Sequence, residues 1–112
     1  MRYTERPEMI AARGHALLPE EIAKTIPALY ATEDKPEACA VVKFFSPYSR
    51  WTCWAFEYDP DDQIFFGLVD GMEREWGYFS LTELDCDRCG LPLVERDLYI
   101  TGDEMPRKRD FE

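Results

Sequence analysis

The sequence predicts an α+β fold: a small antiparallel sheet of four to five strands in a meander, one main helix packed on it, and one short helix near the C-terminal end. Three observations predict this fold. Short segments rich in β-branched and aromatic residues follow one another between residues 39 and 80, separated by turn residues. A segment with helical periodicity precedes them, and a helix-start motif follows them.

The length and composition indicate one domain. The chain has 112 residues, of which 46% are hydrophobic and 14% aromatic, and a chain of this size can bury a core without a metal or disulfides. We expect a polar N-terminal arm at residues 1–16, the folded domain at 17–102 and a polar tail at 103–112. The arm is either a frayed end or a short helix around Pro7 to Arg13.

The main helix is expected to begin near Pro19. Proline is tolerated in a first helical turn, and Glu20 and Glu21 favour the positive end of the helix dipole. Pro27 removes a backbone donor, so we expect a kink there or a division into two short helices. Apolar residues recur at helical spacing and give the helix a face for the core: Ile22, Ile26, Leu29 and Tyr30.

Four strands are expected next, at residues 39–47, 51–59, 63–70 and 73–80. The stretches "DPDD" and "DG" supply turns between them. In the second strand, alternation places Trp54, Phe56 and Tyr58 on one face of the sheet. The opposite face receives the residues between them: Cys53, Ala55 and Glu57.

The C-terminal part begins with a helix start. Ser80 and Glu83 have the spacing of a capping box, in which the hydroxyl and the carboxylate each bind a free backbone amide. This motif predicts a short helix from Leu81 to about Arg88, and Gly90 is placed to end it. A last strand is expected within residues 91–100.

The charge limits the classes of partner. Twenty-three acids against thirteen bases give a formal net charge of −10, which disfavours direct binding to nucleic acid or to an anionic membrane. The same surplus suits a basic protein partner, although it also aids solubility. No apolar run has the length of a signal peptide or a membrane span. We therefore expect a cytoplasmic protein, and no motif implies a cofactor.

Three stretches carry a resemblance to a known family: "LPEEIAKTIPALYATE", "KFFSPYSRWTCWAFEYDPDDQIFFGLVDGMEREWGYFSLTEL" and "GLPLVERDLYI". Over roughly residues 17–100 they resemble the bacterial, plasmid and phage family catalogued as domain of unknown function 2958. The resemblance implies an origin on mobile elements, and some members carry a label of single-stranded DNA endonuclease. No catalytic residue carries over from it. The chain departs from the family pattern in its N-terminal arm and in "DCDRCG".

The acids Asp59, Asp61 and Asp62 have two interpretations. Alternate carboxylates can bind Ca²⁺ or Mg²⁺, but the calcium-loop pattern requires glycine at its sixth position and glutamate at its twelfth. Ile64 and Asp70 stand there instead. A hairpin turn that uses Asp and Pro for their local geometry is the better interpretation.

A metal-dependent endonuclease is the enzymatic alternative, and it would use Asp59, Asp61, Asp62 or Glu73. Such an enzyme usually places a lysine or histidine beside clustered carboxylates. The stretch from residue 57 to 87 contains only one basic residue, Arg74, and the only histidine of the chain is in the arm. The balance therefore favours a protein that is not an enzyme.

The cysteines and the histidine carry weaker signals. Cys86 and Cys89 have the spacing of half a zinc ribbon, but the other half is missing because Cys39 and Cys53 lie fourteen residues apart on separate expected strands. We expect free thiols, with structural zinc and a redox pair as alternatives. His15 could act as a general base, yet no motif ties a nucleophile to it, so we expect a solvated or helix-end histidine.

The interpretation that the residues favour is a non-enzymatic acidic binding protein of a mobile genetic element. Its expected partner is a protein with a basic, nucleic-acid-binding surface, and its most specific form is an anti-CRISPR or anti-restriction inhibitor that mimics DNA. The alternatives are the endonuclease and a small structural zinc or housekeeping domain. Turn carboxylates would supply the charge of the interface: Asp59, Asp61, Asp62, Asp70, Glu73 and Glu75. Two exposed tryptophans, Trp51 and Trp76, would anchor it.

Overall fold

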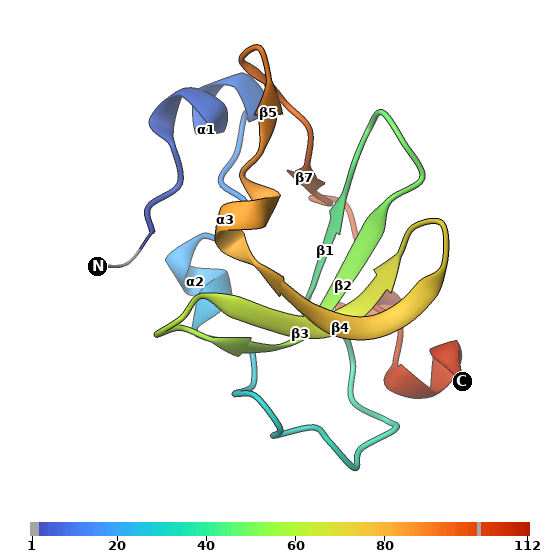
Figure 1. The fold of residues 1–112 in the computed structure, drawn as a ribbon. Coiled ribbons are helices and arrows are strands. Elements are labelled where there is room, and N and C mark those ends of the chain that lie inside the picture. Colours follow the sequence, from blue (N-terminus) through green and yellow to red (C-terminus); the bar gives the residue numbers. More distant parts are fainter. Residues whose placement is uncertain (1–2, 101) are drawn as a thin grey trace.

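The computed structural model describes residues 3–100 and 102–112 and contains a five-stranded antiparallel sheet with the order β4-β3-β2-β1-β7 (Figure 1). The expected α+β class and the meander are therefore confirmed. The sheet consists of β1 (Val42–Phe45), β2 (Thr52–Asp59), β3 (Ile64–Asp70), β4 (Arg74–Ser80) and β7 (Glu95–Arg96). The other elements are α1 (Pro7–Arg13), α2 (Glu20–Ala23), α3 (Leu81–Leu84), the hairpin β5 (Asp87–Arg88) and β6 (Leu91–Pro92), and the 3-10 helices η1 (Gly102–Glu104) and η2 (Lys108–Phe111).

The α-helices and the small hairpin cover one face of the sheet, whereas η2 lies on the other face. In Figure 1, α1, α3 and β5 lie together beside the ribbon formed by β3 and β4, and the C-terminal end lies on the other side of β4. Phe44 and Phe65 are completely buried at the centre of the covered face, with ring centroids 5.4 Å apart. The covered face and the segments above it form one cluster of buried residues: Leu17, Ile26, Val42, Phe44, Cys53, Ala55, Tyr58, Phe65, Phe79, Leu81, Leu84 and Val94.

A β-bulge in β2 changes which side chains reach this core. Ala55 pairs with Gly67, but the next pair is Glu57 with Phe66, so Phe56 is an extra residue in β2. The expected alternation is correct up to Phe56 and wrong for Glu57 and Tyr58. Tyr58 belongs to the core cluster, whereas Phe56 and Glu57 lie on the opposite face, which we call the outer face.

Gly67 is required at the centre of the β2–β3 pair. A Cβ atom at this position would lie 1.8 Å from the carbonyl oxygen of Trp54. No side chain fits at that distance, so the strands can approach each other next to the bulge only because this residue is glycine.

The helix that begins after Pro19 is shorter than expected. It ends at Ala23, and the chain continues in turns with Ile26 buried. Pro27 explains the ending, because it lacks an amide for a helix and disfavours helical geometry at the residue before it. Its carbonyl instead accepts a 2.8 Å hydrogen bond from the backbone amide of Tyr58.

The capping box at Ser80 is confirmed, but its helix ends early. The Ser80 hydroxyl accepts from the Glu83 amide at 3.1 Å, and the Glu83 carboxylate accepts from the Ser80 amide at 2.9 Å. The helix stops at Leu84, not near residue 88. Cys89 and Gly90 have φ values of +51° and +86° between β5 and β6, so this glycine serves a two-residue hairpin turn and not a helix end. The last expected strand is reduced to β6 and β7.

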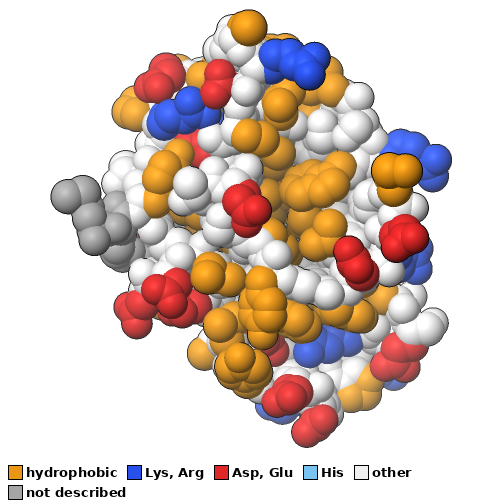
Figure 2. Space-filling view, viewed as in Figure 1, with side chains coloured by type: hydrophobic (Ala, Val, Ile, Leu, Met, Phe, Trp, Pro, Cys, Tyr) orange, Lys and Arg blue, Asp and Glu red, His pale blue; other side chains and the backbone are white. Residues whose placement is uncertain are grey.

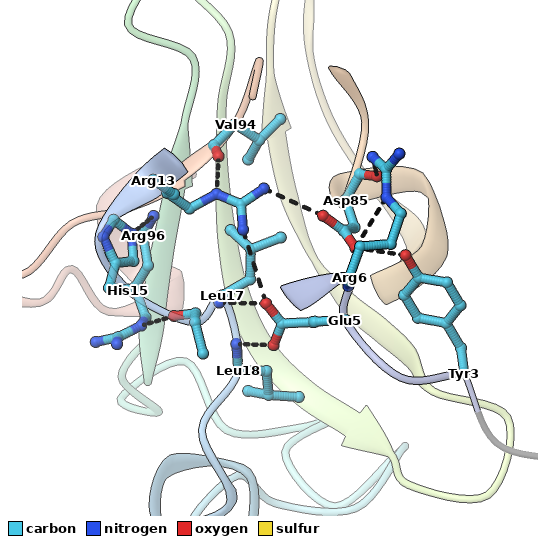
Figure 3. A network of polar contacts seen from close by, with 11 residues as sticks. Tyr3, Glu5, Arg6, Arg13, His15, Leu17, Leu18, Asp85, Val94 and Arg96 are labelled. Carbon is cyan, nitrogen blue, oxygen red and sulfur yellow. Dashed lines mark hydrogen bonds and ion pairs between the residues drawn. The ribbon is translucent and has the colours of Figure 1, made fainter. Parts of the chain in front are cut away.

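The N-terminal arm lies against the rest of the protein through a buried network (Figure 3). Its helix spans Pro7–Arg13, which confirms the short-helix alternative. The guanidinium of Arg13 lies 3.2 Å from the Asp85 carboxylate and donates to the Val94 carbonyl at 2.7 Å. Glu5 accepts hydrogen bonds from the backbone amides that follow the arm, those of Leu17 at 2.6 Å and Leu18 at 2.9 Å.

The C-terminal tail also packs on the body. The backbone amide of Lys108 donates to the carbonyl of Ala38, and that of Arg109 donates to the carbonyl of Pro36, both at 2.9 Å. Phe111 reaches the outer face of the sheet. None of the helices in residues 3–100 and 102–112 is long and apolar enough to cross a membrane.

Candidate functional site

The carboxylates predicted to bind a partner form two groups at opposite ends of β3. Asp59, Asp61 and Asp62 lie at the β2–β3 turn, because Asp59 pairs with Ile64 at one end of that strand. The second group lies at the β3–β4 turn at the other end: Asp70, Glu73 and Glu75.

The two acidic groups flank one face of the molecule. Figure 2 shows acidic side chains at the left and right of the view, where the β2–β3 and β3–β4 turns lie in Figure 1, with apolar side chains between them. In the second group Arg74 lies 3.7 Å from Asp70, and both side chains are largely exposed. Such exposed pairs contribute little, so the turn remains acidic.

The two tryptophans predicted as anchors lie on different faces of the sheet. Trp51 packs partly against the core cluster and lines a groove of about 350 Å³ with Phe79, Leu84 and Leu93. Trp76 lies on the outer face, where its ring stacks on Phe66 at 5.9 Å. Trp51 therefore lies on the covered face and Trp76 on the outer face, so no single face carries both predicted anchors.

The outer face of β2, β3 and β4 carries a second aromatic cluster. Phe56 faces Trp76 there, with their ring centroids 5.3 Å apart. Phe111 closes the cluster from η2, at 6.1 Å from Trp54 and 6.1 Å from Trp76. The sheet therefore carries apolar side chains on both faces: the main core on the covered face and this aromatic cluster on the outer face.

A pocket of about 610 Å³ opens beside this cluster. We call it the aromatic pocket. Its lining comes from the 30–36 segment, the three strands and the C-terminal tail: Tyr30, Glu33, Asp34, Lys35, Pro36, Glu57, Phe66, Trp76, Tyr78, Lys108 and Glu112. Of the residues predicted from the sequence, Trp76 is the one that lines it.

Glu57 holds the aromatic pocket together. Its buried carboxylate accepts hydrogen bonds from the amide of Tyr30 at 2.8 Å, from the amide of Thr32 at 2.9 Å, and from the Thr32 hydroxyl. Burial alone would raise the pKa of Glu57, but these hydrogen bonds and the charge of Lys108 outweigh burial and lower its pKa. Glu57 is therefore a charged anchor for the 30–32 segment.

Lys108 joins the same anchor from the C-terminal tail. Its ammonium lies 3.8 Å from a Glu57 carboxylate oxygen and donates to the Thr32 carbonyl at 2.6 Å. It also lies 5.9 Å from the ring centroids of both Phe66 and Trp76, within the range of a cation–π interaction. The wall of the pocket thus already binds a cation from its own chain.

Two tyrosines form the open side of the aromatic pocket. Tyr30 is 65% exposed and Tyr78 is 55% exposed. A hydrogen bond with Tyr30 is the main cause that raises the pKa of Tyr78, and burial and the negative charges of Glu57 and Glu33 raise it further. Both tyrosine rings therefore remain accessible at the mouth of the pocket.

Cys86 lines the groove of Trp51, whereas Cys39, Cys53, Cys89 and His15 line neither that groove nor the aromatic pocket. Cys86 is half-buried and Cys89 is exposed, and both are free thiols. The part of the chain that the structure describes contains no group of three His, Cys, Asp or Glu side chains that could hold a metal. His15 is half-buried, and its Nε2 accepts a 3.0 Å hydrogen bond from the amide of Arg96. Burial, with Arg96 and Arg13, lowers the pKa of His15.

The family comparison agrees with the resemblance carried by the sequence. No curated protein and no solved structure matches the chain. The model of one family, described as "protein of unknown function (DUF2958)", matches residues 17–106. This match includes β1 to β7 and leaves Lys108 and Phe111 outside it. The chain belongs to the DUF2958 family.

Proposed function

We propose that this protein is a non-enzymatic binding protein that captures a basic surface of another protein. The observation that carries the proposal is the pair of exposed acidic groups at the two ends of β3, with apolar side chains between them on one face (Figure 2). An apolar centre inside a charged rim is the usual anatomy of a protein interface. Trp51, in its groove, is the expected anchor of that centre.

The sheet fixes the distance between the two acidic groups. β3 has seven residues and pairs along its length with β2 and β4, so its ends lie roughly 20 Å apart at about 3.3 Å per residue. This distance exceeds the screening length of about 8 Å at physiological salt. Each group therefore acts on its own part of the partner, and the spacing selects partners with two basic patches.

A nucleic-acid-binding surface is the form of basic surface that fits this spacing. One strand of duplex DNA carries one phosphate per about 3.4 Å of helix axis, so the two acidic groups span the axial length of roughly six base pairs. A partner that holds DNA along a groove would present cations over such a length. Inhibition of a host defence complex by DNA mimicry is the specific form of the proposal, and it would serve a mobile genetic element.

The positions of the same acids give less support to the endonuclease alternative. Two-metal cleavage needs carboxylates that converge on ions about 4 Å apart. Asp61 and Asp62 lie at one end of β3 and Glu73 follows the other end. The enzymatic alternative would therefore have to use only one of the two groups.

The proposal is tested by neutralising each acidic group separately. One variant carries Asn at Asp59, Asp61 and Asp62, and the second carries Asn at Asp70 and Gln at Glu73 and Glu75. The immobilised protein is exposed to an extract of its own cells at low and high salt, and the retained proteins are challenged with duplex DNA. We expect a protein that the wild type retains at low salt, that DNA displaces, and that both variants retain less.

A matched control removes the same number of charges elsewhere. The exposed Glu8, Glu20 and Glu37 are changed to Gln, and we expect retention equal to that of the wild type. Equal loss in this control would show that net charge alone matters and would contradict the proposed interface. Retention that resists high salt and DNA would contradict it as well. Cleavage of single-stranded DNA with Mg²⁺ or Mn²⁺, abolished by changing Asp61 and Asp62 to Ala, would support the endonuclease instead.

A further inference from the structure

We infer that the aromatic pocket is a binding site for an arginine side chain presented by a peptide segment of a partner. This pocket lies on the outer face of the sheet, away from the face of the proposed function, so the inference does not depend on that proposal. Three features carry it: exposed aromatic rings, an aromatic wall that already binds a cation, and an excess of carboxylates.

Aromatic surface is left open at this pocket. Tyr30, Tyr78 and Trp76 keep 65%, 55% and 38% of their surface exposed, and all three line the same space. Tyr30 is held at the rim in a left-handed conformation, with a φ of 71°, by the bond of its amide to Glu57. The rings are therefore fixed by the fold and remain accessible to a ligand.

Lys108 shows what kind of group this wall accepts. Its ammonium lies 5.9 Å from the centroids of Phe66 and Trp76. The Glu57 carboxylate at 3.8 Å balances its charge, and both side chains are nearly buried. The pair occupies the floor of the pocket and leaves the outer rings for a second cation.

The remaining charges of the lining favour a cationic ligand. With Glu57 and Lys108 paired, the carboxylates of Glu33, Asp34 and Glu112 stand against the single ammonium of Lys35. Three negative charges and one positive charge leave an excess of two negative charges at the rim. A guanidinium between the tyrosine rings would meet acceptors on this rim.

Arginine suits this arrangement better than lysine. Its planar guanidinium stacks on aromatic faces and is less strongly hydrated than an ammonium, and it can donate two parallel hydrogen bonds to one carboxylate. The volume of about 610 Å³ is within the usual range of ligand pockets, about 300–1,000 Å³. It accommodates the side chain together with neighbouring backbone of an extended peptide.

The inference is tested with short blocked peptides, Gly-Arg-Gly, Gly-Lys-Gly and Gly-Gln-Gly, titrated into the isotope-labelled protein. We expect the arginine peptide to shift the indole N–H resonance of Trp76 saturably, the lysine peptide to bind more weakly, and the glutamine peptide not to bind. Changing Tyr78 to Leu should weaken arginine binding roughly fivefold, the usual effect of one cation–π contact. Tyr30→Leu, on a separate segment, should weaken it similarly.

Matched controls are available on the same chain. Tyr99 is 88% exposed and does not line the pocket, so Tyr99→Leu should leave the affinity unchanged. Changing Glu33 to Gln and Asp34 to Asn should weaken binding, whereas changing Asp61 and Asp62 to Asn should not. Dispersed amide resonances in each variant verify that it is folded.

The results separate this inference from the proposed function. Equal binding of the three peptides, or equal affinity of the Tyr78 and Tyr99 variants for the arginine peptide, would overturn the arginine site. None of these outcomes changes whether the turn carboxylates retain a basic protein. Conversely, loss of salt-sensitive retention would leave the peptide titrations intact.

Discussion

The ammonium of Lys108 lies 3.8 Å from the carboxylate of Glu57, although one residue belongs to the middle strand of the sheet and the other to the C-terminal tail. Their side chains are only 12% and 4% exposed. The contact joins three separate segments, because Glu57 also binds the amides of Tyr30 and Thr32. This pair connects two walls of the aromatic pocket, the 30–36 segment and the C-terminal tail, to β2.

Removing the Glu57 carboxylate should destabilise the whole domain. Glu57→Ala leaves two amides and one hydroxyl without their acceptor and the Lys108 ammonium without its nearest negative charge. The expected loss is about 3 kcal/mol in the free energy of unfolding. Urea unfolding at pH 7 measures it. Glu33→Gln, on the exposed rim of the same pocket, should change stability by less than about 0.5 kcal/mol. Equal urea midpoints for Glu57→Ala and the wild type would show that the carboxylate is not an anchor.

Acid should weaken the attachment of the N-terminal arm. Burial tends to raise the pKa of Asp85, but hydrogen bonds from Tyr3, from the Arg6 amide and from Arg13 outweigh it and lower the pKa. A carboxyl with a lowered folded pKa contributes stability that is complete above its unfolded pKa, near 4, and that is lost as pH falls through the folded value.

Asp85→Asn tests this pH dependence. At pH 7 the variant should be less stable than the wild type by about 3 kcal/mol, because Arg13 loses its closest buried carboxylate. The difference should narrow as pH falls from about 5 towards 2. Urea unfolding at several pH values measures it, and a difference that stays constant over this range would rule out Asp85 as the titrating group. Asp61→Asn, on an exposed turn, serves as the control.

Gly67 and Gly77 form a matched pair of strand glycines, since they face each other across β3 and β4. A Cβ at Gly67 would lie 1.8 Å from the Trp54 carbonyl oxygen, while a Cβ at Gly77 would meet nothing within 4 Å. Gly67→Ala should therefore lower the free energy of unfolding by about 3 kcal/mol or more. Gly77→Ala should change it by less than about 0.5 kcal/mol. Similar thermal midpoints for the two variants would contradict the close β2–β3 approach.

The four cysteines should react with alkylating agents in an order set by burial. Cys53 is completely buried, and burial, with a smaller effect of Glu83, raises the pKa of its thiol far above the usual range. The exposed Cys39 and Cys89 should be labelled first by iodoacetamide at pH 8, Cys86 more slowly, and Cys53 only after denaturation. Mass spectrometry of labelled peptides gives the order. Protection of Cys86 and Cys89 that a chelator removes would instead favour the structural zinc alternative.

The sequence allowed the main elements to be predicted because their signals are local. Alternating apolar residues and turn pairs between residues 39 and 80 define the strands of the meander, and the register of β1 to β4 follows from their short connections. The capping box of Ser80 and Glu83 depends only on residues three apart in the chain. Both of its predicted hydrogen bonds are present. The acidic β2–β3 and β3–β4 turns were likewise predicted, because each connects two strands that are adjacent in the chain.

The candidate site was predicted only in part, because most of it depends on long-range contacts. Trp76 was expected at an exposed position, but no local pattern marks the bulge at Phe56, which reverses the faces of Glu57 and Tyr58. The bulge depends on the pairing of Ala55 with Gly67 in β3, which the sequence of β2 alone does not reveal. The same limit explains why Lys108, in a tail expected to be simply polar, was not predicted to line a pocket.

The sequence by itself determined the fold class, the order of β1 to β4, the turns and the negative charge, since each follows from the spacing and type of residues close together in the chain. The pairing of β7 with β1 was decided by tertiary structure. Tertiary structure decided which charges are buried and paired. Arg13 with Asp85 and Lys108 with Glu57 connect distant segments, and such pairs form only after strand register and close packing have brought them together. The physical reason is that a buried charge is stable only when an opposite charge or hydrogen-bond partner lies within a few ångströms. The spacing of residues along the chain does not specify which residue that partner is.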